Sequence, residues 1–175
     1  MPGVSDTRER FRQTFGGEGE IGVVSVPGRV NLIGEHIDYH GLPVLPIAIQ
    51  RYVRVAFRAR QDRLIRAVST APYGAREFEW TPELTPAVSG DWQNYLRAAA
   101  QIVGQSHWTG RPTGIDAVVV SDLPAAAGLS SSTALLVAFQ PLPHPKIPVL
   151  LLYVRCRQGV LRPRHRLAGL FHAAW

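Results

Sequence analysis

The segment GRVNLIGEHIDYHG, residues 28–41, gathers four charged or ionisable side chains between two apolar segments. Glu35, His36 and Asp38 can each fix the geometry of a hydrogen bond to a hydroxyl group, because carboxylates accept such bonds and imidazole can donate or accept them. Arg29 carries a permanent positive charge on a planar fork, which suits a phosphate or a developing negative charge. The alternative is a surface loop with an Arg–Glu pair, which contributes little to stability.

A metal site is a further alternative for this segment. His36, Asp38 and His40 stand at alternate positions, as on one face of a strand. The set mixes hard and soft ligands and no helical pattern supports it, so we do not expect zinc there. The single cysteine, Cys156, excludes an internal disulfide and any all-cysteine metal site.

The second candidate segment is DLPAAAGLSSSTALLVAF, where a predicted strand ends at Val120 and a helix begins around residues 129–132. Small residues let the backbone approach a ligand closely, and the first N–H groups of a helix make an anion site suited to phosphate. Ser130, Ser131 and Ser132 add donors and a hydroxyl that can ligate Mg²⁺. No G-K-[ST] follows the first glycine, so this is not a Walker A loop. The alternative is a helix start capped by serine.

Strands and one helix are predicted to position the two segments. RYVRVAFRAR alternates, with Val53, Val55 and Phe57 on one face, as in a half-buried strand. GDWQNYLRAAAQIVGQ has helical spacing, with Asp91 as N-cap and Gly104 as the end of the helix. TAPYGA is a predicted turn. The other predicted strands are residues 21–26, 44–49, 63–69, 76–80 and 113–124.

The basic charge of the chain is confined to its last residues. The 175 residues carry a formal net charge of +6, but residues 1–140 hold 13 basic and 13 acidic residues. Residues 141–175 hold the remaining basic residues and no acid. No signal pattern opens the chain and its apolar runs fall short of the ~20 residues that span a bilayer, so we expect a soluble cytoplasmic protein with one ordinary core.

The same last residues differ from the rest in pattern. Four prolines between residues 141 and 148 must stop the preceding helix, because proline inside a helix costs about 3 kcal/mol. The remainder has much Arg and no clear period. We interpret residues 141–175 as an unmatched basic Pro/Arg-rich tail, the product of a shift in reading frame near Gln140, with a genuine variable tail as the alternative.

The two segments together resemble the galactokinase family of the GHMP small-molecule kinases. GRVNLIGEHIDY is similar to the galactokinase signature over its whole length, and GLSSST resembles the phosphate-binding motif of the superfamily, with Thr133 where Ala is usual. WQNYLRAA is similar to the helix between the two motifs. The resemblance covers roughly residues 8–139.

The resemblance implies an α+β fold. Residues 1–140 would form the N-terminal domain of a GHMP-type kinase (ribosomal protein S5 domain 2-like), an incomplete mixed sheet with helices on one side. This domain would hold both the sugar-binding motif and the ATP phosphate loop.

The resemblance also implies ATP-dependent phosphorylation of galactose at its C1 hydroxyl, in galactose metabolism. Glu35, His36 and Asp38 would bind galactose hydroxyls, and Arg29 would be catalytic by stabilising the transition state. Ser132 would ligate Mg²⁺, so that ATP and Mg²⁺ are the implied cofactors. The residues implied in ATP binding are Ser69, Ala126, Ala127, Gly128, Leu129, Ser130, Ser131 and Ser132.

Some features depart from the family pattern. Ala125, Ala126 and Ala127 stand where the family often has another glycine, and residues 140–175 offer neither the catalytic aspartate nor the glycine-rich motif of a second domain. We therefore expect this chain to be an inactive fragment. HIDY is also similar to the N-acetylgalactosamine kinases, and a non-catalytic galactose or ATP sensor is the alternative of another class. Nucleic-acid binding through the tail is disfavoured, since no recognisable module accompanies the arginines.

Overall fold

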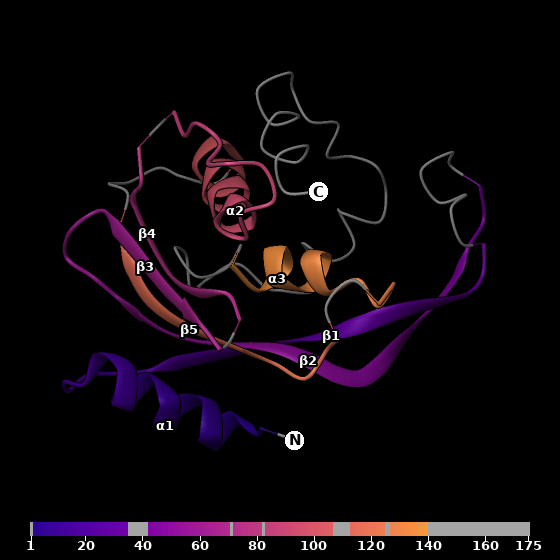
Figure 1. Ribbon diagram of the computed structural model, residues 1–175, viewed down its shortest axis with the longest axis horizontal. Coiled ribbons are helices and arrows are strands. Elements are labelled where there is room, and N and C mark those ends of the chain that lie inside the picture. The colour runs from indigo at the N-terminus through magenta and orange to yellow at the C-terminus, as the bar shows by residue number, and fades with distance from the viewer. Residues whose placement is uncertain are drawn as a thin grey trace.

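The computed structural model describes residues 2–34, 42–70, 72–81, 83–106, 113–124 and 127–139 (Figure 1). Predictions for residues 35–41, 125–126 and 140–175 lie outside the described residues, and the division of the chain at residue 140 stays a prediction. The elements, in chain order, are α1 (Val4–Phe15), β1 (Gly22–Ile33), β2 (Leu45–Ala59), β3 (Leu64–Ser69), β4 (Gly74–Glu79), α2 (Gln93–Ser106), β5 (Ile115–Ser121) and α3 (Ser131–Phe139).

The strands form one mixed sheet in the order β1-β2-β5-β3-β4. The pairs β1–β2, β2–β5 and β3–β4 are antiparallel, whereas β3 and β5 are parallel. The central strand β5 is buried from Ile115 to Val120. A strand that is covered on both faces is expected to have a continuous apolar run, and β5 contains the run AVVV. The predicted α+β class and mixed sheet are confirmed.

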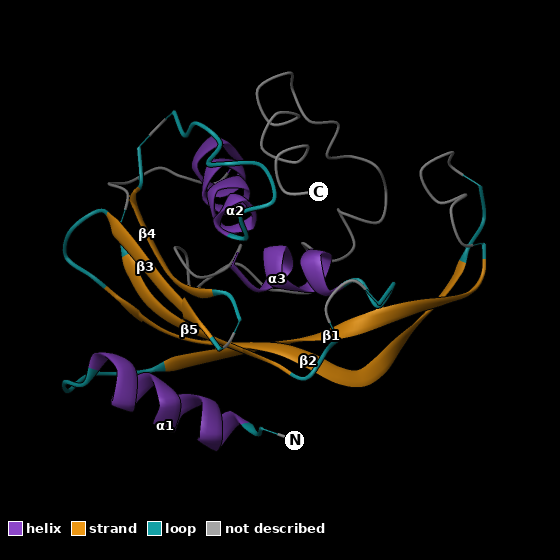
Figure 2. Cartoon of the chain, in the orientation of Figure 1, coloured by secondary structure: helices purple, strands orange, loops and turns teal. Residues whose placement is uncertain are grey.

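The helices lie on both faces of the sheet (Figure 2). Helices α2 and α3 cover the inner face, where the main core contains residues such as Val53, Val55, Leu96 and Val137. Helix α1 lies on the outer face. The expected placement of helices on one side is therefore correct for α2 and α3 and is wrong for α1.

The packing of α1 explains this difference. Phe11 is fully buried in a second cluster with Ala56, Val118 and Val120, which belong to the outer face of β2 and β5. The guanidinium of Arg58 lies 5.2 Å from the ring centroid of Phe11, within cation–π range. The alternation predicted for β2 is confirmed, but its second face is covered by α1 instead of facing solvent.

Four charged side chains form a row across the outer face, which we call the charge row: Glu77, Arg66, Asp116 and Arg58. The register pairs each with the next, from β4 through β3 and β5 to β2. Asp116 Oδ1 accepts hydrogen bonds from Arg66 Nε at 2.7 Å and from Arg60 Nη1 at 2.9 Å. Burial alone would raise the pKa of Asp116, but these hydrogen bonds outweigh it, so the pKa lies below its usual value.

Three boundaries bear on the sequence predictions. β1 continues through Gly28 and Arg29, beyond the predicted strand end at residue 26, so the candidate segment begins inside a strand. Asp91 caps α2 as predicted, because its Oδ1 accepts the N–H of Gln93 at 2.9 Å. Gly104 does not end α2, which runs on to Ser106. Among the described residues, no helix is long and apolar enough to cross a membrane.

Candidate active site

Gly28 and Arg29 of β1 lie against the loop that precedes α3. The backbone N–H of Arg29 donates a hydrogen bond to the carbonyl oxygen of Leu129, with N and O 3.2 Å apart. A Cβ atom on Gly28 would stand 3.0 Å from the same oxygen and would overlap a methyl group of Leu123. The glycine therefore permits the close approach. The two candidate segments, far apart in sequence, meet through their backbones here.

The serine-rich segment forms the start of α3. Gly128 and Ser130 have positive φ values of 69° and 58°, so the chain turns sharply before the helix. The carbonyl of Ser130 accepts the N–H of Ala134 at 2.9 Å, which is the first hydrogen bond of the helix. The N–H groups of Ser131 and Ser132 therefore belong to the first turn, where helix geometry supplies no acceptor. This geometry agrees with the anion site predicted from the sequence.

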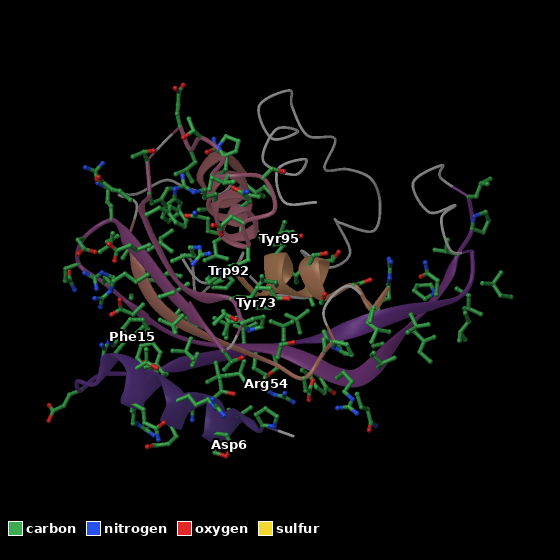
Figure 3. All side chains as sticks on the ribbon, viewed as in Figure 1. Asp6, Phe15, Arg54, Tyr73, Trp92 and Tyr95 are labelled. Carbon is green, nitrogen blue, oxygen red and sulfur yellow. The ribbon has the colours of Figure 1, made fainter. Side chains whose placement is uncertain are left out.

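Tyr95 of α2 contacts the same turn, since its side chain hydrogen-bonds with Ser132. Burial raises the pKa of Tyr95, and the bond to Ser132 offsets part of that rise. Trp92 Nε1 donates to the carbonyl oxygen of Tyr73 at 3.0 Å. Figure 3 shows Tyr73, Trp92 and Tyr95 together between α2 and the sheet, close to α3. The turn after β3, the start of α2 and the start of α3 therefore converge.

Ser69 lies at the end of β3, next to the turn that approaches the starts of α2 and α3. It is the last residue of β3 and pairs with Gly74 in β4 and with Val119 in β5. The turn that follows it contains Tyr73. The structure thus places Ser69 at the base of the turn that leads from β3 to β4.

The remaining predicted site residues divide into two groups. Ala127, Gly128 and Leu129 lie in the loop before α3, and Ser130 directly precedes the helix. Outside the described residues are Glu35, His36, Asp38 and Ala126, so their grouping stays a prediction. Within the described part of the chain, no cluster of three or more His, Cys, Asp or Glu residues could hold a metal ion.

Sequence reasoning missed two contributions to the site. Gly28 was noted only as the start of a motif, although a glycine inside a strand often marks a close backbone approach. Tyr95 belongs to the segment predicted as a helix, and a buried tyrosine hydroxyl usually has a hydrogen-bond partner. The glycine and the tyrosine are visible in the sequence, but the sequence does not show that they contact Leu129 and Ser132.

Two family models and several known proteins are similar to this chain. The family model described as "Galactokinase galactose-binding signature" matches residues 9–59, and the one described as "GHMP kinases N terminal domain" matches residues 94–140. The galactokinase of Roseiflexus sp. (strain RS-1) is 38% identical over 138 residues, which is 79% of this chain and 34% of that protein. The chain belongs to the galactokinase family.

Another curated galactokinase and two solved structures are also similar to the chain. The Homo sapiens galactokinase is 37% identical over 143 residues, 77% of this chain and 35% of that protein. The chain thus spans about a third of the length of these curated galactokinases. A crystal structure of Lactococcus lactis galactokinase complexed with galactose matches with a TM-score of 0.70 and 26% identity, over 98% of this chain and 43% of that one. The mevalonate kinase of Methanococcus jannaschii, 16% identical with a TM-score of 0.64 over 90% of this chain and 51% of that one, shares the fold.

Proposed function

We propose that this chain supplies the sugar-binding segment and the ATP phosphate loop of an enzyme that transfers the γ-phosphoryl group of ATP to the C1 hydroxyl of galactose. The observation that carries the proposal is the backbone contact between Arg29 and Leu129. It joins the matched galactose-binding signature to the loop before α3, so a sugar and a nucleotide phosphate held by the two segments would be neighbours. Phosphoryl transfer depends mainly on such positioning and on charge stabilisation.

On the sugar side, the proposal assigns Glu35, His36 and Asp38 to galactose hydroxyls. Arg29 belongs to the same segment and lies in β1, where it pairs with Ala48 of β2. Its guanidinium is a planar fork that can hydrogen-bond two oxygens at once. In the proposal it stabilises the negative charge that develops on the transferred phosphoryl group.

On the nucleotide side, backbone N–H groups from Ala126 to Ser132 hold the ATP phosphates, and Ser69 lies near the nucleotide. The Ser132 hydroxyl is a hard oxygen ligand of the kind that Mg²⁺ accepts, alongside phosphate oxygens. A bound Mg²⁺ would neutralise phosphate charge. Tyr95 holds the Ser132 side chain through their hydrogen bond and so limits the directions in which that hydroxyl can point.

Calorimetry on the 175-residue chain tests this assignment. We expect saturable binding of galactose and of MgATP. Asp38→Ala should weaken galactose binding, because Asp38 is assigned to the sugar hydroxyls, and Ser132→Ala should weaken MgATP binding, because it removes the hydroxyl assigned to Mg²⁺. We expect no turnover by this chain alone, since residues 141–175 supply no carboxylate to accept the proton of the sugar hydroxyl.

The choice of sugars in the titration separates the alternatives. Tighter binding of N-acetylgalactosamine than of galactose would favour the N-acetylgalactosamine kinases. Binding of both sugar and nucleotide by a protein of the length of the relatives, without phosphoryl transfer, would favour a sensor. Absence of binding of any sugar and of MgATP would contradict the proposal.

A further inference from the structure

Asn31 is a buried amide in the middle of the galactose-binding signature. Both its side-chain atoms, Nδ2 and Oδ1, are shielded from solvent, and neither has a hydrogen-bond partner within the part of the chain that the structure describes. Nearly all buried polar atoms in native proteins are hydrogen-bonded, and leaving one unsatisfied costs about 1–3 kcal/mol. An amide with both ends unsatisfied therefore needs an explanation.

Asn94 of α2 shows the usual arrangement of a buried asparagine in this same protein. Its Oδ1 accepts the N–H of Ala87 at 2.8 Å, and its Nδ2 donates to the carbonyl of Val88 at 3.0 Å. That side chain holds the loop before α2 to the helix. Among the residues that the structure describes, the Asn31 side chain holds no other group in this way, so its amide is available to a ligand.

The position of Asn31 points to the active site. The register of β1 against β2 is continuous from Arg29 to Asn31, so the two residues lie on the same face of the strand. Two residues along a strand are about 6.6 Å apart. Asn31 thus stands one repeat along β1 from Arg29, the residue assigned above to the transferred phosphoryl group, and it lies in sequence between Arg29 and Glu35.

We infer that Asn31 is a specificity-determining residue that hydrogen-bonds hydroxyl groups of the sugar; this inference rests on the proposed function. The donor and acceptor atoms of the amide favour a sugar hydroxyl as the ligand. Nδ2 can only donate and Oδ1 can only accept, so both are satisfied by a group that also does both. A sugar hydroxyl donates and accepts, whereas a phosphate oxygen only accepts and would leave Oδ1 unsatisfied. A sugar hydroxyl can therefore satisfy both ends of the Asn31 amide, whereas the phosphate groups of the nucleotide cannot.

The test compares Asn31→Leu with the matched control Asn94→Leu in the 175-residue chain. Replacing an unsatisfied amide by an apolar side chain of similar shape removes a desolvation cost, so the urea midpoint of Asn31→Leu should equal or exceed that of the wild type. Asn94→Leu breaks two formed hydrogen bonds, and its midpoint should fall. Galactose affinity of Asn31→Leu should decrease by about tenfold, as for the loss of one to two hydrogen bonds, with MgATP affinity unchanged.

The outcomes distinguish failure of the inference about Asn31 from failure of the proposed function. If Asn31→Leu binds galactose as tightly as the wild type does, or lowers the urea midpoint as much as Asn94→Leu, the inference is wrong and the proposed function stands. If the wild type binds no sugar, the proposed function fails and the inference fails with it. Deoxygalactose analogues identify the galactose hydroxyl that Asn31 binds. The analogue that lacks this hydroxyl should bind to the wild type and to Asn31→Leu with equal affinity.

Discussion

The substitution Gly28→Ala tests whether the close approach of β1 to the loop before α3 holds the site together. The added Cβ would stand 3.0 Å from the Leu129 carbonyl oxygen and 3.3 Å from Ile49 Cδ1, and it would overlap a methyl group of Leu123. The Leu129 oxygen is backbone and is bonded to the Arg29 amide, so it cannot move without breaking that bond. Leu123 lies in the main core and has little room to turn away.

Forced overpacking of this kind costs about 1–3 kcal/mol. In a protein of this size, each kcal/mol lowers the melting temperature by about 2–4 °C. The assay is urea unfolding followed by tryptophan fluorescence, because Trp80 and Trp92 are buried in the main core and report its loss. MgATP affinity, measured by calorimetry under native conditions, should fall as well, since the loop is pushed off β1.

The control is Gly3→Ala, which adds the same methyl group where its contacts would be ordinary, at 3.7 Å or more. This variant reports the change in backbone entropy that any Gly→Ala substitution brings, together with the loss of glycine at the N-cap of α1. A Gly28→Ala variant within about 0.5 kcal/mol of the wild type, with unchanged MgATP affinity, would refute the reasoning, since that is the scatter of surface substitutions.

Three more predictions concern other parts of the molecule. Asp116→Asn should lower the free energy of unfolding by about 2 kcal/mol at pH 7, since charge-assisted hydrogen bonds are lost. Because the folded-state pKa of Asp116 is depressed, its stabilisation is present above the ordinary carboxyl pKa and is lost as the pH falls through the depressed value; unfolding measured from pH 7 to pH 2 should show a shallower acid slope in the variant. Tyr95→Phe should weaken MgATP binding about fivefold and leave galactose binding unchanged in calorimetry, because it frees the Ser132 hydroxyl; equal weakening of both ligands would contradict this. Arg29→Lys in an active protein of the relatives' length should reduce kcat by about 10²-fold with little change in the KM for galactose, and a change confined to KM would count against a transition-state role.

Features with a local signature were predicted from the sequence. The alternation of Val53, Val55 and Phe57 places these residues in the main core or against it, as expected from a strand period of two. Asp91 caps α2 because its side chain needs only the N–H two residues ahead. The start of α3 at the serines follows from the apolar run behind them.

Features that depend on tertiary contacts were not predicted. VSDTRERFRQTF is largely polar and buries only Thr7 and Phe11, so α1 lacks the apolar stripe that marks a helix in sequence. The strand β1 continues through Pro27 and Gly28 because it lies at the edge of the sheet, where a proline is tolerated. Gly104 lies inside α2, because a helix that packs on a core can absorb the cost of about 1 kcal/mol of an internal glycine.

The candidate site was predicted as two separate motifs and not as a geometry. Residue types in GRVNLIGEHIDY and GLSSST indicate what each segment can bind. The bond from Arg29 to Leu129 and the one between Tyr95 and Ser132 depend on the order of strands in the sheet and on the packing of α2 against α3. Neither order nor packing is encoded in the local pattern of any one segment.

The strand order also sets the point during synthesis at which the sheet can close. β1–β2 and β3–β4 are hairpins of neighbouring strands, which form in about 1–10 μs. Only β5 joins them, pairing with β2 on one side and β3 on the other. Until Ile115–Ser121 has left the ribosome, the two hairpins keep their inner edges unpaired and open to other chains. Of the described strands, β5 is thus made last and closes the sheet, and its amides should be among the slowest to exchange with deuterium.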